Sequence, residues 1–285
     1  MRTYHYIGGF AIVLLIISCG GGGSSGSSSV DTTLIEIDTP AKAENTFYAI
    51  GRNSEDFYAL TGWSEMVLET LNNKLVESND PPAKSPYKDL MLPCPVKGTM
   101  TVNGSIVSNG TRAYDIDVDL KDCYLDEDGG LEGSITYRGS ASETTATEMN
   151  IEMKHLRIGL YLLDEMTADM TIRVENNPNL GSYKSVLNGM VAGLKEAVTF
   201  SDFSIAVEKD AAGAPQYMDG RFDMTRSMTP CLVGGYEVST VTPLADGGKI
   251  RVNNAEIVYQ KEGGVRIDYQ KGSVTLVKRP ELHCP

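Results

Sequence analysis

From Cys94 onward, apolar and polar residues alternate along the chain with a period of two. In the run YDIDVDL at residues 114–120, aspartates separate the apolar residues. Alternation of this kind gives a strand one wet face and one buried face, which is typical of an antiparallel sheet covered on one side. Turn signals such as Asn109-Gly110 and Gly129-Gly130 separate the runs. Further alternating runs occur at residues 149–153, 168–174, 203–207 and 265–269.

A weak internal repeat accompanies the alternation. The pattern apolar-x-Gly-x-apolar is centred on Gly104, Gly133, Gly189 and Gly220, and Ala168 could stand at a missing copy. A glycine inside a strand marks a bulge, a bend or a close backbone approach, and repeated kinks curve a sheet. We therefore expect a mainly β fold, either a curved antiparallel sheet or an open β-barrel or meander, with one N-terminal helix.

The segment before the alternating region has a different period. Trp63, Val67, Leu71 and Leu75 recur at every fourth position, which predicts a helix over residues 62–76 whose apolar stripe packs on the sheet. The proline-containing residues 78–93 are expected to form a loop into the β region. Residues 185–198 fit either a strand or a helix.

The N-terminus has the pattern of an export signal. An apolar run from Ile7 to Ile17 is too short to span a bilayer, which needs about 20 residues, and matches the hydrophobic region of a signal peptide. The run ends in Ile16-Ile17-Ser18-Cys19, which resembles the lipobox of bacterial lipoproteins. The resemblance implies cleavage after Ser18 and a lipid on Cys19. With Gly20 rather than Asp after the cysteine, it favours the outer membrane in a host with two membranes.

These signals divide the chain into four expected parts. Residues 1–18 form the signal peptide, and residues 19–29 form a lipidated tether whose residues after Cys19 are all Gly or Ser. Such a tether cannot bury enough apolar surface to fold. Residues 30–92 form a helix-containing N-terminal segment, and residues 93–285 form an antiparallel β domain.

Four cysteines remain in the mature chain. An even number in an exported protein favours disulfide bonds, and four cysteines allow three pairings. We favour Cys94 with Cys123 and Cys231 with Cys284, because each pair lies in its own β-rich block. A zinc site is the less favoured alternative, since the cysteines lack the close spacing of zinc ligands.

The β-rich body also resembles a group of uncharacterised exported bacterial lipoproteins with Cys/Gly-rich β repeats. The likeness covers roughly residues 94–280. It lies in blocks such as Gly104 through Asp122-Cys123 and CLVGGYEV from Cys231. It implies a cell-envelope location and a β fold, and it implies no catalytic residues.

The charge and the motifs exclude several functions. A net charge of −13 argues against nucleic-acid binding, because phosphate contacts need clustered Lys and Arg. No catalytic motif is present, so we expect no catalytic residue, cofactor or metal ligand. His155 lies on the apolar side of its strand where the pattern shifts, which predicts a bulge and a buried, satisfied imidazole. The acidic turn at Asp126-Glu127-Asp128 is interpreted as a solvated surface rather than a calcium site.

The sequence therefore predicts a cell-envelope lipoprotein held by the lipid on Cys19 on a membrane, which we expect to be the outer one. We expect a non-catalytic structural or interaction module with an envelope protein or lipid as its partner. One alternative is a carrier that holds a lipid or another hydrophobic ligand on the concave face of the sheet. A hydrolase is a further alternative.

Overall fold

A computed structural model describes most of the folded body. The described residues are 33–77, 86–108, 112–127, 129–141, 146–160, 166–177, 182–194, 196–208, 215–244, 247–260 and 264–277. The predicted signal peptide, the lipidated Cys19 and the Gly/Ser tether lie outside them, as does Cys284.

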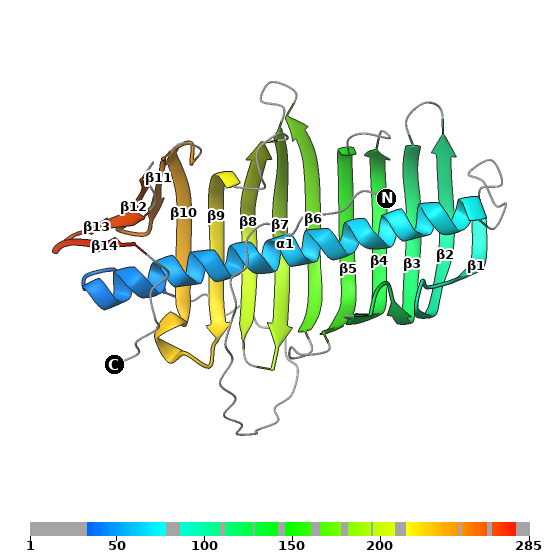
Figure 1. The fold of residues 1–285 in the computed structure, drawn as a ribbon, viewed down its shortest axis with the longest axis horizontal. Coiled ribbons are helices and arrows are strands. Elements are labelled where there is room, and N and C mark those ends of the chain that lie inside the picture. The colour runs from blue at the N-terminus through cyan, green and yellow to red at the C-terminus, as the bar shows by residue number, and fades with distance from the viewer. Residues whose placement is uncertain are drawn as a thin grey trace.

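The described strands form one antiparallel sheet whose spatial order is the order of the chain (Figure 1). The sheet is not closed, so β1 and β14 are its two edges. This confirms the predicted curved antiparallel meander. The strands are β1 (Tyr87–Pro93), β2 (Lys97–Ser108), β3 (Arg112–Tyr124), β4 (Gly129–Ala141), β5 (Ala146–Leu160), β6 (Met166–Asn177), β7 (Ser182–Gly193), β8 (Ala197–Glu208), β9 (Pro215–Arg226), β10 (Gly234–Thr242), β11 (Lys249–Val252), β12 (Ala255–Tyr259), β13 (Val265–Tyr269) and β14 (Gly272–Leu276). A short 3-10 helix, η2 (Pro230–Leu232), joins β9 to β10.

Two local differences from the prediction concern the strands. Residues 87–93, expected to be a loop, form the edge strand β1. Its period is broken by a bulge at Asp89, where the register with β2 shifts, so the alternation was not visible in the sequence. Of residues 185–198, which fitted either a helix or a strand, residues 185–193 lie in β7 and residues 197–198 lie in β8.

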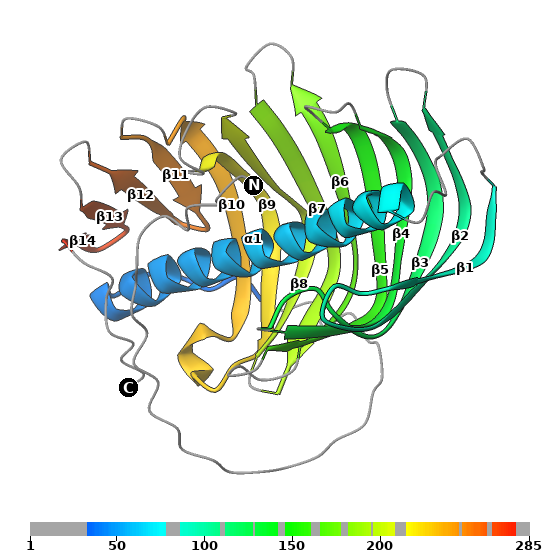
Figure 2. The ribbon, with the colours of Figure 1, turned by 45° about the vertical axis from the view of Figure 1, so that its right-hand side comes forward.

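The helix α1 (Pro40–Glu77) is far longer than the predicted residues 62–76. It crosses the concave face of the sheet from the C-terminal strands to β1 (Figures 1 and 2). The helix begins with favourable capping chemistry, because Thr39 Oγ1 accepts a hydrogen bond from the Lys42 N–H and Pro40 occupies the first turn. The early half lacks a strong apolar stripe, since its buried positions include Ala43, Thr46 and Asn53.

The repeat glycines curve the sheet around this helix (Figure 2). Gly104, Gly133, Gly189 and Gly220 all have positive φ, between 108° and 128°. A Cβ atom on Gly220 would lie 2.2 Å from the carbonyl oxygen of Asp202, so a larger residue does not fit. The predicted role of the glycines is therefore confirmed. Ala168 is not a further kink, because its φ is not positive.

The core joins the helix and the inner face of the sheet into one cluster of buried side chains. Leu60, Val67 and Leu71 of α1 belong to it, with no exposed surface. The hydroxyl of the fully buried Tyr137 donates to the Ser64 carbonyl of the helix at 2.7 Å. Beneath the first half of the helix, Phe203, Phe222 and Tyr236 follow one another in ring contact.

The segment before the helix is fixed to the C-terminal half of the sheet. Leu34 forms a parallel bridge with Gly235 of β10. Asn254, in the turn between β11 and β12, accepts from the Ile37 N–H at 2.8 Å and donates to the Ile37 carbonyl at 3.1 Å. The chain therefore enters the folded body beside the start of β10.

Candidate functional site

The convex face of the sheet presents the polar residues of the alternating pattern. The strand register places side chains from β4 to β7 in two adjacent rows, and all of them except Val186 are polar. One row contains Thr136, Glu152, Thr171 and Asn188, and the next contains Arg138, Asn150, Arg173 and Val186.

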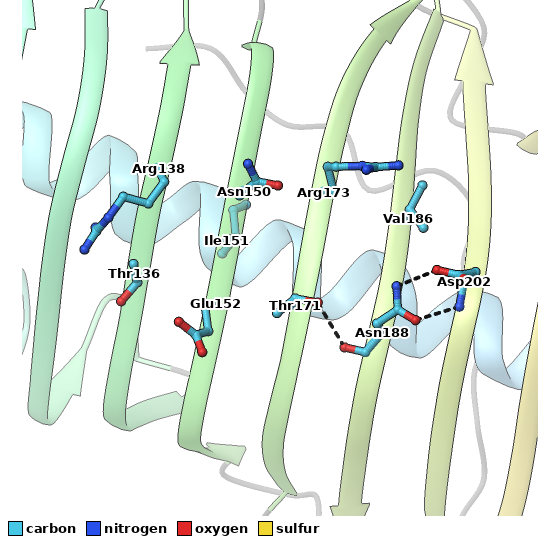
Figure 3. A pocket seen from close by; sticks show the side chains of 10 residues that line it. All are labelled: Thr136, Arg138, Asn150, Ile151, Glu152, Thr171, Arg173, Val186, Asn188 and Asp202. Carbon is cyan, nitrogen blue, oxygen red and sulfur yellow. Dashed lines mark hydrogen bonds between the residues drawn. The ribbon is translucent and has the colours of Figure 1, made fainter.

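These rows line a shallow pocket of about 480 Å³ (Figure 3). It extends from β4 to β8, which is about 19 Å at the usual spacing of strands. Its lining residues are Thr136, Arg138, Asn150, Ile151, Glu152, Thr171, Arg173, Val186, Asn188 and Asp202. We call this surface the convex groove.

At the β4 end, the charges of the convex groove are neutralised by β3. The guanidinium of Arg138 pairs with Asp115 and with Asp117, whose Oδ1 lies 3.1 Å from Nη2. Thr136 Oγ1 also donates to Asp117 Oδ1 at 2.6 Å. The bond from Thr136 and the charge of Arg138 hold the pKa of Asp117 below its usual range, so this carboxylate remains ionised at neutral pH.

At the β8 end, Asn188 and Asp202 form a reciprocal pair (Figure 3). Asn188 Nδ2 donates to Asp202 Oδ1 at 2.9 Å, and the Asp202 backbone N–H donates to Asn188 Oδ1 at 2.8 Å. Asp202 has a φ of 47°, which is the left-handed conformation, and it lies at a register shift between β8 and β9. This end of the convex groove is therefore fixed by a bulge.

The middle of the convex groove offers mixed hydrogen-bonding groups. Asn150 is exposed, and in the described part of the chain its amide has no hydrogen-bond partner. Arg173 Nε lies 2.8 Å from Glu175 Oε1, and Glu152 pairs with Lys154 at 3.2 Å. Thr171 Oγ1 makes only a long bond of 3.4 Å to the Asn188 carbonyl. An amide, a hydroxyl, an anion and a cation in an open groove suit a polar ligand.

The prediction of a buried His155 is wrong, although the bulge is confirmed. His155 has a φ of 47° and lies at the register shift between β5 and β6, and its side chain is 87% exposed. The bulge turns the imidazole outward, where Nδ1 lies 2.9 Å from Asp169 Oδ1. Asp169 Oδ1 also accepts from the His155 backbone N–H at 2.7 Å. This histidine is not among the residues that line the convex groove.

The first predicted disulfide is confirmed. Cys94 and Cys123 are joined at a sequence separation of 29, and the bond ties the β1–β2 turn to the end of β3. Cys231, in η2, is also a disulfide cysteine. Its predicted partner Cys284 lies outside the described residues, so that pairing stays a prediction.

The acidic turn between β3 and β4 does not assemble a metal site from the described residues. Asp126 and Glu127 are described, and Asp128 is not. Across the described parts of the chain, no group of three or more His, Cys, Asp or Glu side chains is placed to hold a metal ion. Asp115 and Asp117 from the same acidic run are ion-paired with Arg138 instead.

Comparisons with known proteins found no matching family model, no similar curated protein and no similar solved structure. No helix in the described part of the chain combines the length and the hydropathy that a membrane crossing requires.

Sequence reasoning placed several lining residues in alternating runs but assigned a function to none of them. The alternation identified residues such as Asp117 as facing outward, but it did not indicate which of the outward-facing residues form a binding site. One usable signal was present, because Asn103, Asn188 and Asp219 each precede a repeat glycine. Each of these three side chains accepts a hydrogen bond from the backbone of a neighbouring strand.

Proposed function

We propose that this protein is a cell-envelope lipoprotein, anchored through a lipid on Cys19, that acts as a non-catalytic interaction module. The proposal depends on the difference in coverage between the two faces of the sheet. Helix α1 occupies the concave face, while the convex face leaves a polar groove open (Figures 1 and 3). The convex groove is therefore the surface that stays open for a partner to bind.

The packing of the concave face counts against the carrier alternative. An acyl chain on that face would have to displace helix α1, whose Leu60, Val67 and Leu71 have no exposed surface. Each such side chain contributes about 1.5–3 kcal/mol by its burial. The charged and amide side chains in the lining of the convex groove also count against an apolar ligand, because such a ligand would remove water from them without replacing its hydrogen bonds.

The chemistry of the convex groove supports a binding role over a hydrolytic one. Its lining residues include no histidine, cysteine or serine. Hydrolytic mechanisms at neutral pH use a nucleophile beside a base, or a metal-bound water. The His155–Asp169 pair lies on the exposed bulge of β5, and the hydrogen bonds of His155 outside the strand ladder go to Asp169.

The expected partner of the convex groove is an extended polar molecule of the envelope. Asn150 and Thr171 offer donors and acceptors, and Arg173 and Glu152 offer one charge of each sign. Fixed groups at the two ends, Asp117 with Arg138 and Asn188 with Asp202, limit rearrangement on binding.

Site-specific photo-crosslinking in living cells tests the interaction. A photoreactive amino acid replaces Thr171, which is exposed in the convex groove, and in a control replaces Thr275, which is exposed on edge strand β14. We expect a defined envelope adduct from position 171 only, and we expect Asn150→Ala with Arg173→Ala to reduce it at least fivefold. Equal adducts at both positions, or none at 171, would contradict the proposal.

The anchor is tested separately. Cys19→Ala should leave the precursor without lipid and uncleaved by the lipoprotein peptidase, because the modified sulfur is the recognition element of the lipobox. Mass spectrometry of the wild-type N-terminus should show an acylated Cys19. A cleaved N-terminus without lipid would rule out the anchor and leave the crosslinking result standing.

A further inference from the structure

Four exposed apolar side chains lie at one end of strands β7 to β10. Leu194, in the β7–β8 turn, is 76% exposed, Met228 and Val233 beside η2 are 58% and 40% exposed, and Leu34 is 39% exposed. The register places them at the same end, because Ala192 pairs with Ala197 and Ala197 with Arg226. This end is the lower one in Figure 1. We call these four residues the apolar rim.

The chain enters the folded body at the same place. The Gly235 N–H donates to the Thr33 carbonyl at 3.1 Å, so Thr33 lies beside the start of β10, next to Val233. Cys19 precedes Thr33 by 14 positions in the sequence. A flexible chain of that length has an r.m.s. span of about 20 Å. The opposite end of the sheet is farther away by the length of a strand, about 40 Å for the 12 residues of β7.

We propose that the apolar rim rests on the surface of the lipid bilayer and orients the sheet on the membrane. This inference rests on the proposed anchor at Cys19. A short tether that leaves from the rim keeps the rim within reach of the headgroups. Four apolar side chains are too few to hold the protein without a lipid, but they suffice to select one orientation once the anchor is in place.

The charges at this end favour contact through β7 to β10 over contact through the β3–β4 turn. Arg226 is exposed beside Leu194, its Nη2 bonded to the Gly193 carbonyl, and a guanidinium suits lipid phosphates. The acidic residues Asp126 and Glu127 are at the same end of the strands but at the β3–β4 turn. The sheet should therefore tilt, with the apolar rim against the bilayer and the acidic turn away from it.

Fluorescence quenching by brominated lipids tests this orientation. The lipidated full chain is placed in vesicles of phosphatidylethanolamine and phosphatidylglycerol at three to one, with bromine on the acyl chains. Trp63→Phe removes the single tryptophan of the chain, and Leu194→Trp or Met228→Trp reports on the apolar rim. Val107→Trp is the matched control, because Val107 is 50% exposed at the opposite end of the sheet.

We expect quenching at positions 194 and 228 to exceed that at 107 at least twofold. Equal quenching, or stronger quenching at 107, overturns the orientation. Hydrogen exchange of the unsubstituted protein supplies a second measurement, independent of how the variants fold. Vesicles should slow the exchange of residues 226–234 relative to detergent and leave residues 104–107 unchanged, and the reverse pattern overturns the proposal.

Flotation of the same vesicles separates this inference from the proposed function. If the protein floats with the vesicles but shows equal quenching at both ends, only the orientation is wrong. If the wild-type protein stays in the soluble fraction, the anchor and the orientation are both wrong.

Discussion

The Asp202 N–H donates to Asn188 Oδ1 at 2.8 Å, and Asn188 Nδ2 donates back to Asp202 Oδ1 at 2.9 Å. The same backbone bond recurs from Asp89 to Asn103 and from His155 to Asp169. In all three cases the partners are 14 residues apart, and the donor has a positive φ near 50°. A side-chain oxygen on one strand therefore satisfies the N–H of a bulge on its neighbour, and repetition of this device helps to curve the sheet.

Removal of the Asn188 amide should weaken the bulge at Asp202. We expect Asn188→Ala to lower the free energy of unfolding by about 1–2 kcal/mol, since it removes two exposed hydrogen bonds that hold the bulge. Asn103→Ala is the matched control, because it removes only the bond from the Asp89 N–H and should cost about half as much. Chemical denaturation measures both, and equal losses would contradict the reciprocal role of Asn188.

Alanine at a repeat glycine should be far more costly than alanine in the helix. Gly220→Ala places its Cβ 2.2 Å from the Asp202 carbonyl oxygen at a φ of 114°, and we expect a loss of about 3 kcal/mol or more. Gly62→Ala is the control, since nothing lies within 4 Å of its Cβ, and alanine in a helix should stabilise by about 1 kcal/mol. Thermal unfolding compares them, and a neutral Gly220→Ala would mean that the kink is not required.

The sheet was predictable from the sequence because its signals are local. Alternation identified strands such as residues 114–120, and the repeat glycines indicated curvature without knowledge of the partner strand. The first half of α1 was not predictable, because small and polar residues such as Ala43, Thr46 and Asn53 interrupt its buried face and leave no regular apolar stripe. Its helical state depends on the sheet that covers it, which no local pattern reports.

The convex groove was not predictable for a different reason. Asn150 and Arg173 become neighbours only through the register of β5 and β6. Register depends on bulges, and a bulge such as the one at His155 moves a side chain to the other face. The sequence indicated the shift at His155, but only the paired strands determine where the imidazole points.

Loss of the Cys94–Cys123 disulfide should destabilise the β1–β2 end of the sheet. The bond closes a loop between positions 29 residues apart, and the chain-entropy model gives about 3–4 kcal/mol for such a loop. We expect the double variant Cys94→Ser with Cys123→Ser to lose about 3–4 kcal/mol of its free energy of unfolding, and therefore to unfold at a lower temperature. A peptide map of the wild-type protein is the control, and a link from Cys94 to Cys231 would contradict the pairing.

A comparison of two variants at His155 tests backbone strain, because both variants lose the same side-chain contact. His155→Gly and His155→Ala both remove the Nδ1 contact with Asp169. Glycine adopts a φ of 47° freely and alanine does not, so we expect the glycine variant to be more stable than the alanine variant by about 1 kcal/mol. If alanine is the more stable of the two, the left-handed conformation is absent in solution.

The last prediction concerns alkaline pH and the contact between sheet and helix. Burial, and then the charge of Glu65, raises the pKa of Tyr137 well above its ordinary value. Burial also raises the pKa of Tyr236, and that of Tyr259 to about 12. In the unfolded chain a tyrosine ionises near pH 10. The folded state therefore retains a proton that the unfolded state releases, so the stabilisation is complete below about pH 10 and is lost as the pH rises toward the folded pKa.

Tyr137→Phe should reveal this loss as a change in how steeply the free energy of unfolding falls with pH. At pH 8 we expect the variant to be less stable by about 1–2 kcal/mol, because the Ser64 carbonyl loses its 2.7 Å bond from the tyrosine hydroxyl. Above about pH 10, the difference should shrink by up to about 1.4 kcal/mol per pH unit, since only the wild type still has this group to ionise on unfolding. Tyr236→Phe removes a similar bond, 2.8 Å to the Leu232 carbonyl, and should behave alike. Denaturation between pH 8 and 11 measures both, and a constant difference would show that the hydroxyl of Tyr137 is not buried against the helix.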